Sequence, residues 1–329
     1  MPELYDVAAI GNAIVDVIAP ADDAFLVAEA MDKGAMMLID EARGRDLYSR
    51  MAPGVETSGG SAANTIAGVA SYGGRAAFLG KVAPDQLGEV FAHDMRAIGA
   101  HFETPPLIGG PATARSLINV TPDGQRTMST FLGASTEFAA DDVDPAVIEG
   151  ARIVYLEGYL FDAPAARRAF AKTAGLARAA GRMVAITLSD GFVVERHREG
   201  LLAFLETQVD LVFANETEAM ALFETSDFDT ALAGLRSKVK IAAVTRSAKG
   251  SVITSNGQTY GVSAFPVEKV VDTTGAGDQY AAGFMFGLAT GRPLNVCGQL
   301  GSLAASEVIS HYGPRPQVNL AELAAQKGL

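Results

Sequence analysis

Short apolar runs alternate with longer amphipathic segments through the second half of the chain. The apolar runs have the length of buried strands and fall at 153–156, 184–188, 211–213 and 241–245. The segments between them carry apolar residues at helical spacing, over 163–180, 195–206, 216–223 and 228–235. Because two neighbouring parallel strands need a crossover between them, this alternation predicts βαβ units. We therefore expect an α/β fold with a mostly parallel central sheet flanked by helices.

The first half of the chain predicts a different kind of element. Residues 115–120 and 126–132 flank a Thr-Pro-Asp-Gly turn, which predicts a β-hairpin. Since hairpin strands are antiparallel, we expect this hairpin outside the parallel sheet, as an appendage or lid. Residues 22–50 mix helical and extended patterns and allow no assignment. The other predicted elements are two strands and a helix, at 7–10, 76–80 and 85–98.

Composition narrows the functional classes. The chain has 329 residues, and its net charge of −12 argues against general affinity for nucleic acid or anionic membranes. No apolar run reaches the roughly 18 residues of a membrane-spanning helix. The single cysteine, Cys297, excludes an internal disulfide and suits a reducing compartment, so we expect a cytoplasmic protein in which this residue is a small buried side chain.

The stretch Asp-Thr-Thr-Gly-Ala-Gly-Asp at 272–278 places two glycines and an aspartate where a loop becomes an apolar helix. N–H groups at a helix start attract an anion such as phosphate, and glycine lets the anion approach the main chain. An aspartate such as Asp278 has a reason to face an anion only if it meets a proton or a hydroxyl. This combination suggests phosphoryl transfer, although an ordinary packing turn is the alternative.

Spacing separates this loop from two other phosphate-binding loops. A dinucleotide-binding fingerprint needs glycine or alanine three residues after Gly277, where Tyr280 stands. The pattern GxxxxGK[ST] of the P-loop occurs nowhere in the chain. If the loop binds an anion, it belongs to a third type.

Two further features are candidates for ligand binding. Asp16 follows the first predicted strand, where ligands bind in open α/β sheets, although a turn residue is the alternative. The stretch Ser-Gly-Gly-Ser-Ala-Ala-Asn-Thr at 58–65 is a second glycine pair before a helix, with Asn64 about one turn in. A capped core helix would explain its apolar face but not the doubled glycine beside a polar amide.

Asn215 and Glu218 follow the strand at 211–213 and are three residues apart, so they share one face of a helix that starts near Asn215. One amide and one carboxylate, with waters completing the shell, suit Mg²⁺ bound through a nucleotide. The same spacing resembles a capping box, with Asn at the N-cap and Glu at N3, which these two residues alone favour.

Taken together, the three motifs resemble those of the ribokinase or PfkB family of carbohydrate and nucleoside kinases, in the family's order and over the whole chain. The stretches GNAIVD at 11–16 and DLVFANETEA at 210–219 are most similar to adenosine kinases. The resemblance implies a ribokinase-like three-layer fold, one kinase domain over 1–329, and a β-lid formed by roughly 13–40 and 104–132. It also implies ATP-dependent phosphorylation of the 5′-hydroxyl of a nucleoside, adenosine first. The alternatives are a sugar kinase acting on a free carbohydrate and a non-catalytic nucleoside sensor, whereas a dinucleotide-dependent oxidoreductase lacks its fingerprint.

The resemblance also assigns roles to matching residues. It gives the base role to Asp278 and the anion hole to Gly275, Ala276 and Gly277. Acceptor binding is implied for Asn12, Asp16, Gly59, Gly60, Ser61 and Asn64, with apolar walls expected from Ile14, Met37, Phe131 and Tyr159, and a lid arginine at Arg115. ATP binding is implied for Asn215, Thr245, Ser247, Gly250, Gly275 and Gly277, and Mg²⁺ binding, largely through water, for Asn215 and Glu218.

Three expectations complete the picture. A monovalent cation such as K⁺ is an option near the anion hole. The partners are small molecules, a nucleoside or a sugar, and the protein is a monomer or a dimer that pairs through its lid. Finally, the helix start should lower the pKa of Asp278, leaving it ionised at neutral pH but a feeble base.

Overall fold

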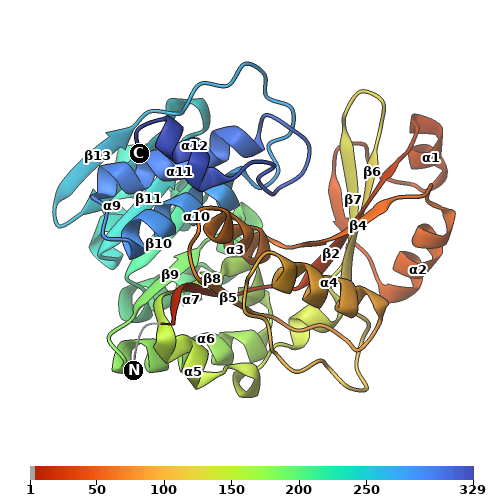
Figure 1. The fold of residues 1–329 in the computed structure, drawn as a ribbon, viewed down its shortest axis with the longest axis horizontal. Helices are drawn as coiled ribbons and strands as arrows, with labels where there is room; N and C mark the ends of the chain where they lie inside the picture. The colour runs from red at the N-terminus through yellow and green to blue at the C-terminus, as the bar shows by residue number, and fades with distance from the viewer. Residues whose placement is uncertain (1–3) are drawn as a thin grey trace.

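A computed structural model describes residues 4–329, which form a large and a small sheet (Figure 1). The large sheet has eight strands, in the spatial order β13, β12, β11, β10, β9, β8, β1, β5. The six strands from β11 to β5 run parallel, β12 pairs antiparallel with β11, and β13 pairs antiparallel with β12. Their bounds are β1 (Tyr5–Ile10), β5 (Ala76–Leu79), β8 (Ala151–Glu157), β9 (Met183–Thr187), β10 (Leu211–Asn215), β11 (Ile241–Thr245), β12 (Ser251–Ser255) and β13 (Gln258–Val262).

The six predicted strands of this sheet are confirmed, and the β12–β13 hairpin was missed. Its signal was present in the sequence, because Asn256-Gly257 joins the two strands and both residues have positive φ (49° and 77°). An Asn-Gly pair in that conformation makes the tight turn of a two-residue hairpin.

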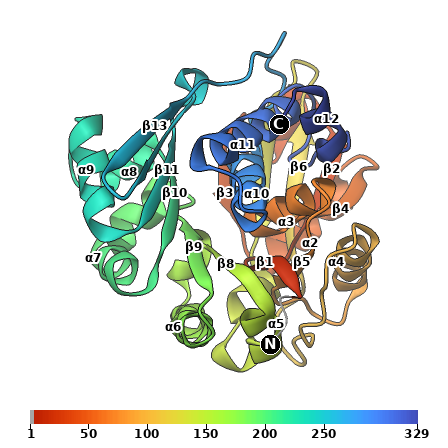
Figure 2. The same ribbon diagram turned by 60° about the vertical axis from the view of Figure 1, so that its left-hand side comes forward.

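Helices cover both faces of the large sheet, as Figure 2 shows, so the fold has three layers. One face carries α5 (Pro145–Gly150), α6 (Pro164–Ala179), α7 (Gly191–Gln208), α8 (Glu216–Leu222) and α9 (Phe228–Lys238). The other carries α3 (Ser61–Ser71), α4 (Gln86–Ala97), α10 (Ala276–Ala289), α11 (Leu294–Val308) and α12 (Leu320–Gln326). Four short 3₁₀ segments complete the list, at Gly133–Glu137, Ala140–Asp142, Gly158–Asp162 and Ser247–Lys249. Cys297 lies buried in α11, as expected.

The small sheet stands beside the three layers (Figure 1). Its five strands lie in the order β3 (Met36–Leu38), β7 (Arg126–Phe131), β6 (Ala114–Val120), β2 (Ile14–Pro20) and β4 (Val55–Gly59). The predicted hairpin is confirmed as β6 and β7, outside the large sheet. β2 and β4 were not predicted, and β4 comes from residues outside the two ranges expected for the lid.

Two helices cover one face of the small sheet, α1 (Asp23–Ala28) and α2 (Glu41–Arg50). Val17 and Leu117 on that face pack with Leu26 and Leu47 of these helices in one apolar cluster. Because side chains alternate along a strand, the neighbouring residues of each strand point to the opposite face. That opposite face looks toward the large domain and lines a cavity described below.

The helix α10 is held tightly against α11. A Cβ at Gly283 would lie 2.5 Å from the carbonyl oxygen of Leu300, and a Cβ at Gly301 would lie 2.6 Å from that of Tyr280. The two glycines therefore allow a close approach of the two backbones. This packing fixes the position of α10 and of the glycine motif at its start.

Replacing Gly283 by alanine should consequently destabilise the protein, whereas the same change at Gly175 should not. Gly175 lies exposed on α6 with no atom within 4 Å of its Cβ position. We expect Gly283→Ala to lower the free energy of unfolding by roughly 1–3 kcal/mol, and Gly175→Ala to raise it by about 0.5–1 kcal/mol. Urea unfolding measures both. Equal stability of the two variants would show that the α10–α11 contact is not close-packed.

Candidate active site

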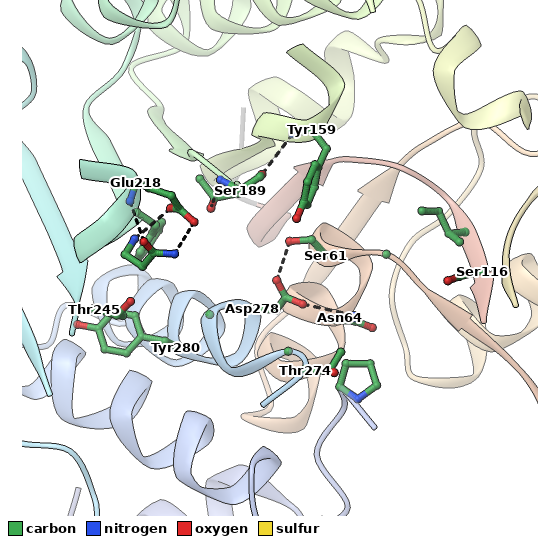
Figure 3. A pocket seen from close by; sticks show the side chains of 18 of the residues that line it. Ser61, Asn64, Ser116, Tyr159, Ser189, Glu218, Thr245, Thr274, Asp278 and Tyr280 are labelled. Atoms are coloured by element: carbon green, nitrogen blue, oxygen red, sulfur yellow. Dashed lines mark hydrogen bonds between the residues drawn. The ribbon is translucent and has the colours of Figure 1, made fainter. Parts of the chain in front are cut away.

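Two helix starts that are led by glycine face each other across the Asp278 carboxylate. α3 begins after Gly60 (φ 93°), and α10 begins after Gly275 (φ 78°). Ser61 Oγ of α3 donates a hydrogen bond to Asp278 Oδ1 at 2.6 Å, and Asn64 Nδ2 lies 3.4 Å from Oδ2 (Figure 3). The two sequence motifs, more than 200 residues apart, thus meet at one carboxylate.

The expectation that the helix start lowers the pKa of Asp278 was wrong. Burial of the carboxylate raises its pKa to about 6, and the hydrogen bonds from Ser61 and Asn64 offset only part of that rise. Loss of hydration therefore outweighs the helix start and the two donors. Asp278 is still mostly ionised at pH 7, but it is a stronger base than an ordinary aspartate.

The glycines around this aspartate have separate reasons to be glycine. A Cβ at Gly275 would lie 2.6 Å from the Pro314 carbonyl oxygen, and the residue has left-handed backbone angles. Gly277 is different, because no atom lies within 4 Å of its Cβ position. It leaves open space beside the first N–H groups of α10, which is the arrangement that admits a phosphate.

One cavity of about 330 Å³ lies on the Asp278 side of this turn, between the small sheet and the large domain. Of the residues expected to bind the acceptor, Ile14, Asp16, Gly60, Ser61, Asn64 and Tyr159 line it. Asp16 is buried, and burial raises its pKa to about 6, while Arg315 and Arg126 counteract that rise. A Cβ at Gly59 would lie 2.5 Å from Asp16 Oδ2, so Gly59 makes room for the aspartate.

A second cavity of about 580 Å³ lies at the end of the large sheet near β11. Thr245, Ser247 and Gly250 line one side of it, as expected for a nucleotide loop. Its other walls include the apolar side chains Val267, Val270, Phe265, Ala305 and Ile309. Both cavities share Thr245, Gly277 and Tyr280, so they join at the start of α10. A donor in one cavity and an acceptor in the other would meet beside Asp278.

A model of the pfkB family of carbohydrate kinases matches residues 6–320. The chain belongs to this family. It is therefore an ATP-dependent phosphotransferase with a hydroxyl acceptor, and the expected ribokinase-like fold is confirmed. The kinase assignment removes the oxidoreductase and the non-catalytic sensor from the alternatives.

The names of individual relatives refer to different acceptors. The structure of adenosine kinase from Sinorhizobium meliloti is 55% identical, covers 98% of this chain and 99% of its own, and superposes with a TM-score of 0.91. A probable sugar kinase protein from Rhizobium etli CFN 42 is 49% identical, covers 100% and 99%, and has a TM-score of 0.92. Adenosine kinase 2 of Arabidopsis thaliana is 25% identical over 92% of this chain and 93% of its own.

Three residues expected in the acceptor site of this kinase lie on the wrong face of the small sheet. Phe131 follows Thr130, which lines the cavity, and packs toward α2 beside Gly44, while Met37 pairs with Ser129 on the same face as Phe131. Arg115 pairs with Phe131 across β6 and β7, with its guanidinium 5.9 Å from the ring centre, and interacts with Glu41, Arg45 and Tyr48. The cavity is instead lined from this sheet by Ser116, Ile118, Met128 and Thr130. The sequence showed the strands but not which alternate set faces inward.

Asn12 also differs from its expected role, since it does not line the acceptor cavity. It is 3% exposed, and its Nδ2 donates to Glu157 Oε1 at 2.6 Å. Glu157, which sequence reasoning missed, also accepts from the backbone N–H of Ala62 at 2.9 Å. Its position at the carboxyl end of β8 was a usable signal, because ligand sites in α/β sheets gather there. The carboxylate ties β1 to the start of α3.

Asn215 and Glu218 form a complete capping box at the start of α8. Asn215 Oδ1 accepts from the Glu218 N–H at 2.8 Å, and Glu218 Oε2 accepts from the Asn215 N–H at 3.0 Å. Both residues also line the acceptor cavity, and burial raises the pKa of Glu218 to about 7. Over residues 4–329, no three His, Cys, Asp or Glu side chains gather into a metal cluster. The pair can therefore hold Mg²⁺ only if waters and phosphate oxygens supply the remaining ligands, which is the usual way in which proteins bind Mg²⁺.

A buried ion pair links the small sheet to the anion loop of the kinase. Arg126 of β7 bonds to Asp272, with both side chains less than a tenth exposed. Asp272 also accepts from the N–H groups of Thr274 and Gly313 at 3.0 and 3.1 Å. Asp272 is the first residue of the motif at 272–278 but was given no role of its own, and no local pattern in the sequence marks Arg126. The monovalent cation expected near this loop stays a prediction.

Replacing Gly277 by alanine tests whether the open space beside α10 serves an anion. The change should leave the stability intact, because the Cβ would touch nothing, while kcat should fall on the order of 100-fold through loss of the phosphate position. Thermal unfolding and steady-state kinase assays measure the two effects. Gly275→Ala is the matched contrast, since it should destabilise the fold through its backbone angles and its contact with Pro314. A Gly277→Ala enzyme of normal kcat would refute the anion role.

Proposed function

We propose that this kinase transfers the γ-phosphate of ATP to the 5′-hydroxyl of adenosine. The observation that carries the proposal is the shape of the acceptor cavity beyond Asp16 and Asn64. Ile14, Ile118 and Met128 give it an apolar wall on the small sheet, and Tyr159 lines it from the large domain. The flat, apolar face of a nucleoside base would pack against this wall and bury it, whereas a free sugar would leave the wall in contact with water.

The relatives support a nucleoside acceptor. The kinase from Sinorhizobium meliloti, named an adenosine kinase, is 55% identical over nearly the whole chain. More distant curated relatives named adenosine kinase, from Arabidopsis thaliana and Saccharomyces cerevisiae, align over 92% and 93% of this chain.

The charges around the cavity support a neutral acceptor. The two cations nearest to Asp16 are Arg126 and Arg315. Arg126 is paired with Asp272, and Arg315 interacts with Asp16 and Asp94. Each positive charge thus has a negative partner within the protein. Among residues 4–329, both cations that act on Asp16 are thus already paired, so neither is free to bind a phosphorylated acceptor.

The geometry supports different roles for the two cavities, one binding the acceptor and the other binding ATP. Asp16 and Asn64 hold hydroxyl groups of the sugar, so that the 5′-hydroxyl reaches Asp278. Asp278 takes the hydroxyl proton as the new oxygen–phosphorus bond forms and the bond to the ADP oxygen breaks. N–H groups at the start of α10 stabilise the charge on the phosphoryl group in transit. Asn215 and Glu218 would hold Mg²⁺, largely through water, and the ion would neutralise charge on the phosphates. Positioning supplies most of the acceleration, as in other loose phosphoryl transfers.

A sugar kinase is the second candidate, and one pair of side chains favours it. Ser116 Oγ and Thr130 Oγ1 lie 2.9 Å apart in the wall of the acceptor cavity. These hydroxyls could bind a further sugar hydroxyl in place of a polar edge of a base. The relative from Rhizobium etli, 49% identical, is named a probable sugar kinase.

An assay with Mg-ATP and a panel of nucleosides and free sugars separates the two candidates. We expect adenosine to give AMP with a kcat/KM at least about 100-fold above that for ribose or fructose, because the apolar wall contributes binding only to a base. A preference for a free sugar would contradict the adenosine proposal.

Two methionines on opposite faces of the small sheet supply the matched test of that wall. Met128→Ala should raise the KM for adenosine about tenfold, because it removes apolar contact with the base. Met37→Ala should leave this KM unchanged, since Met37 lies on the face toward the helices. The reverse order of effects would show that the wall lies on the other face.

A further inference from the structure

Arg315 has no role in the motifs described above, yet it contacts Asn64, which lines the acceptor cavity. Its Nε donates to Asn64 Oδ1 at 3.2 Å, and its Nη2 lies 3.9 Å from Met95 Sδ. It interacts electrostatically with Asp16 and Asp94, and burial lowers its own pKa. One arginine therefore touches Asn64 and faces Asp16, the two side chains assigned above to acceptor binding.

The segment that delivers Arg315 is fixed to the anion loop. The Gly313 N–H donates to Asp272 Oδ2 at 3.1 Å, and the Pro314 carbonyl accepts from Gln279 Nε2 at 3.0 Å. Gln279 also donates to the Asn64 carbonyl at 2.9 Å. These hydrogen bonds consequently fix the position of Arg315 relative to both helix starts that flank Asp278.

The hydrogen bond from Arg315 decides which way the Asn64 amide points. With Oδ1 held by the guanidinium, Nδ2 faces Asp278 Oδ2 at 3.4 Å. A flipped amide would turn its oxygen toward the carboxylate and toward any acceptor hydroxyl near it, which is unfavourable. The arginine thus makes Asn64 a donor toward the reacting end of the cavity.

The positive charge of Arg315 acts on Asp16. Burial raises the pKa of Asp16, and the nearby Asp278 raises it further, whereas Arg315 and Arg126 lower it. An ionised Asp16 accepts hydrogen bonds from two hydroxyls, but a protonated one must donate with one of its oxygens. Without Arg315, only Arg126 would oppose protonation, and that residue is already paired with Asp272.

We propose that Arg315 is a positioning residue of the kinase, which orients the Asn64 amide and supplies the charge that Asp16 needs to hold acceptor hydroxyls. It does not touch the reacting atoms. The proposal rests on the assignment of Asp16, Asn64 and Asp278 made above. Asp278→Asn is therefore assayed alongside, since normal activity of that variant would overturn the site itself.

Two variants separate the charge from the hydrogen bond. Arg315→Met removes both, and Arg315→Lys keeps the charge without the Nε donor. For each, kcat and the KM values for acceptor and ATP are measured from pH 5 to 8, together with thermal unfolding. The titratable and charged groups around Asp16, Asp278 and Arg315 are Asp94, Arg126, Tyr155, Glu157 and Tyr159. None of these is altered in either variant.

In Arg315→Met the acceptor KM should rise at least about tenfold, as expected for the loss of a hydrogen bond to a charged group, with the KM for ATP unchanged. The acidic limb of its kcat/KM profile should move to higher pH, because a cation that lowers the pKa of Asp16 is gone. Arg315→Lys should restore the position of that limb while its acceptor KM stays raised.

Three results would overturn the proposal while Asp278→Asn is inactive. One is a folded Arg315→Met enzyme with the acceptor KM and acidic limb of the wild type. Another is an equal rise of both KM values, which indicates a general loss of structure. The third is an acidic limb in Arg315→Lys that is displaced from its wild-type position. If Arg315→Met does not fold, the lysine variant decides alone.

Discussion

The structure depends on a carboxylate held out of water between two helix starts. Asp278 belongs to α10 and accepts its hydrogen bond from Ser61 of α3, so one side chain joins the two glycine motifs. Keeping it there is costly, as its raised pKa shows. The cost is tolerated because α10 cannot move: Gly283 and Gly301 let it lie against α11, and Gln279 ties it to α3. Burying the carboxylate thus lowers the stability of the fold but places a base where the phosphate and the hydroxyl meet.

The topology explains why the site lies where it does. β5 and β8 flank β1 on opposite sides, so the chain changes direction in the sheet at β1. The crevice at such a switch point opens at the carboxyl ends of the strands. Asn12, just after β1, is hydrogen-bonded to Glu157 at the end of β8, and β2 follows Asn12 to start the small sheet. The same strand therefore carries Asp16 into the wall of the acceptor cavity and forms part of the small sheet.

The parts of the fold that could be predicted from the sequence are those determined by residues close together in the chain. The apolar runs of the parallel strands are buried on both faces of the sheet, and glycines mark the two helix starts. The inward face of the small sheet was not predictable in this way. Arg115 and Phe131 are each one residue away from a side chain that lines the cavity, and Met37 pairs with Ser129 on the same face as Phe131. The register depends on the pairing of β2 with β6, which are about 100 residues apart. The prediction for the pKa of Asp278 was wrong for a related reason, because the burial that raises this pKa is a property of the assembled fold.

The central claim, that burial raises the pKa of the base, can be measured through the pH dependence of stability. A carboxylate with a raised pKa in the folded state stabilises the fold below its unfolded pKa and loses that contribution as pH rises through the folded pKa. The stability of the wild type relative to Asp278→Asn should therefore fall between pH 4 and pH 7, on the order of 2 kcal/mol. Groups that do not interact with Asp278 cancel in this difference, whereas Asp16 and Glu157, whose pKa values the Asp278 charge raises, add to the fall. A relative stability that rises over the same interval would mean that the helix start lowers the pKa, and the account would be wrong.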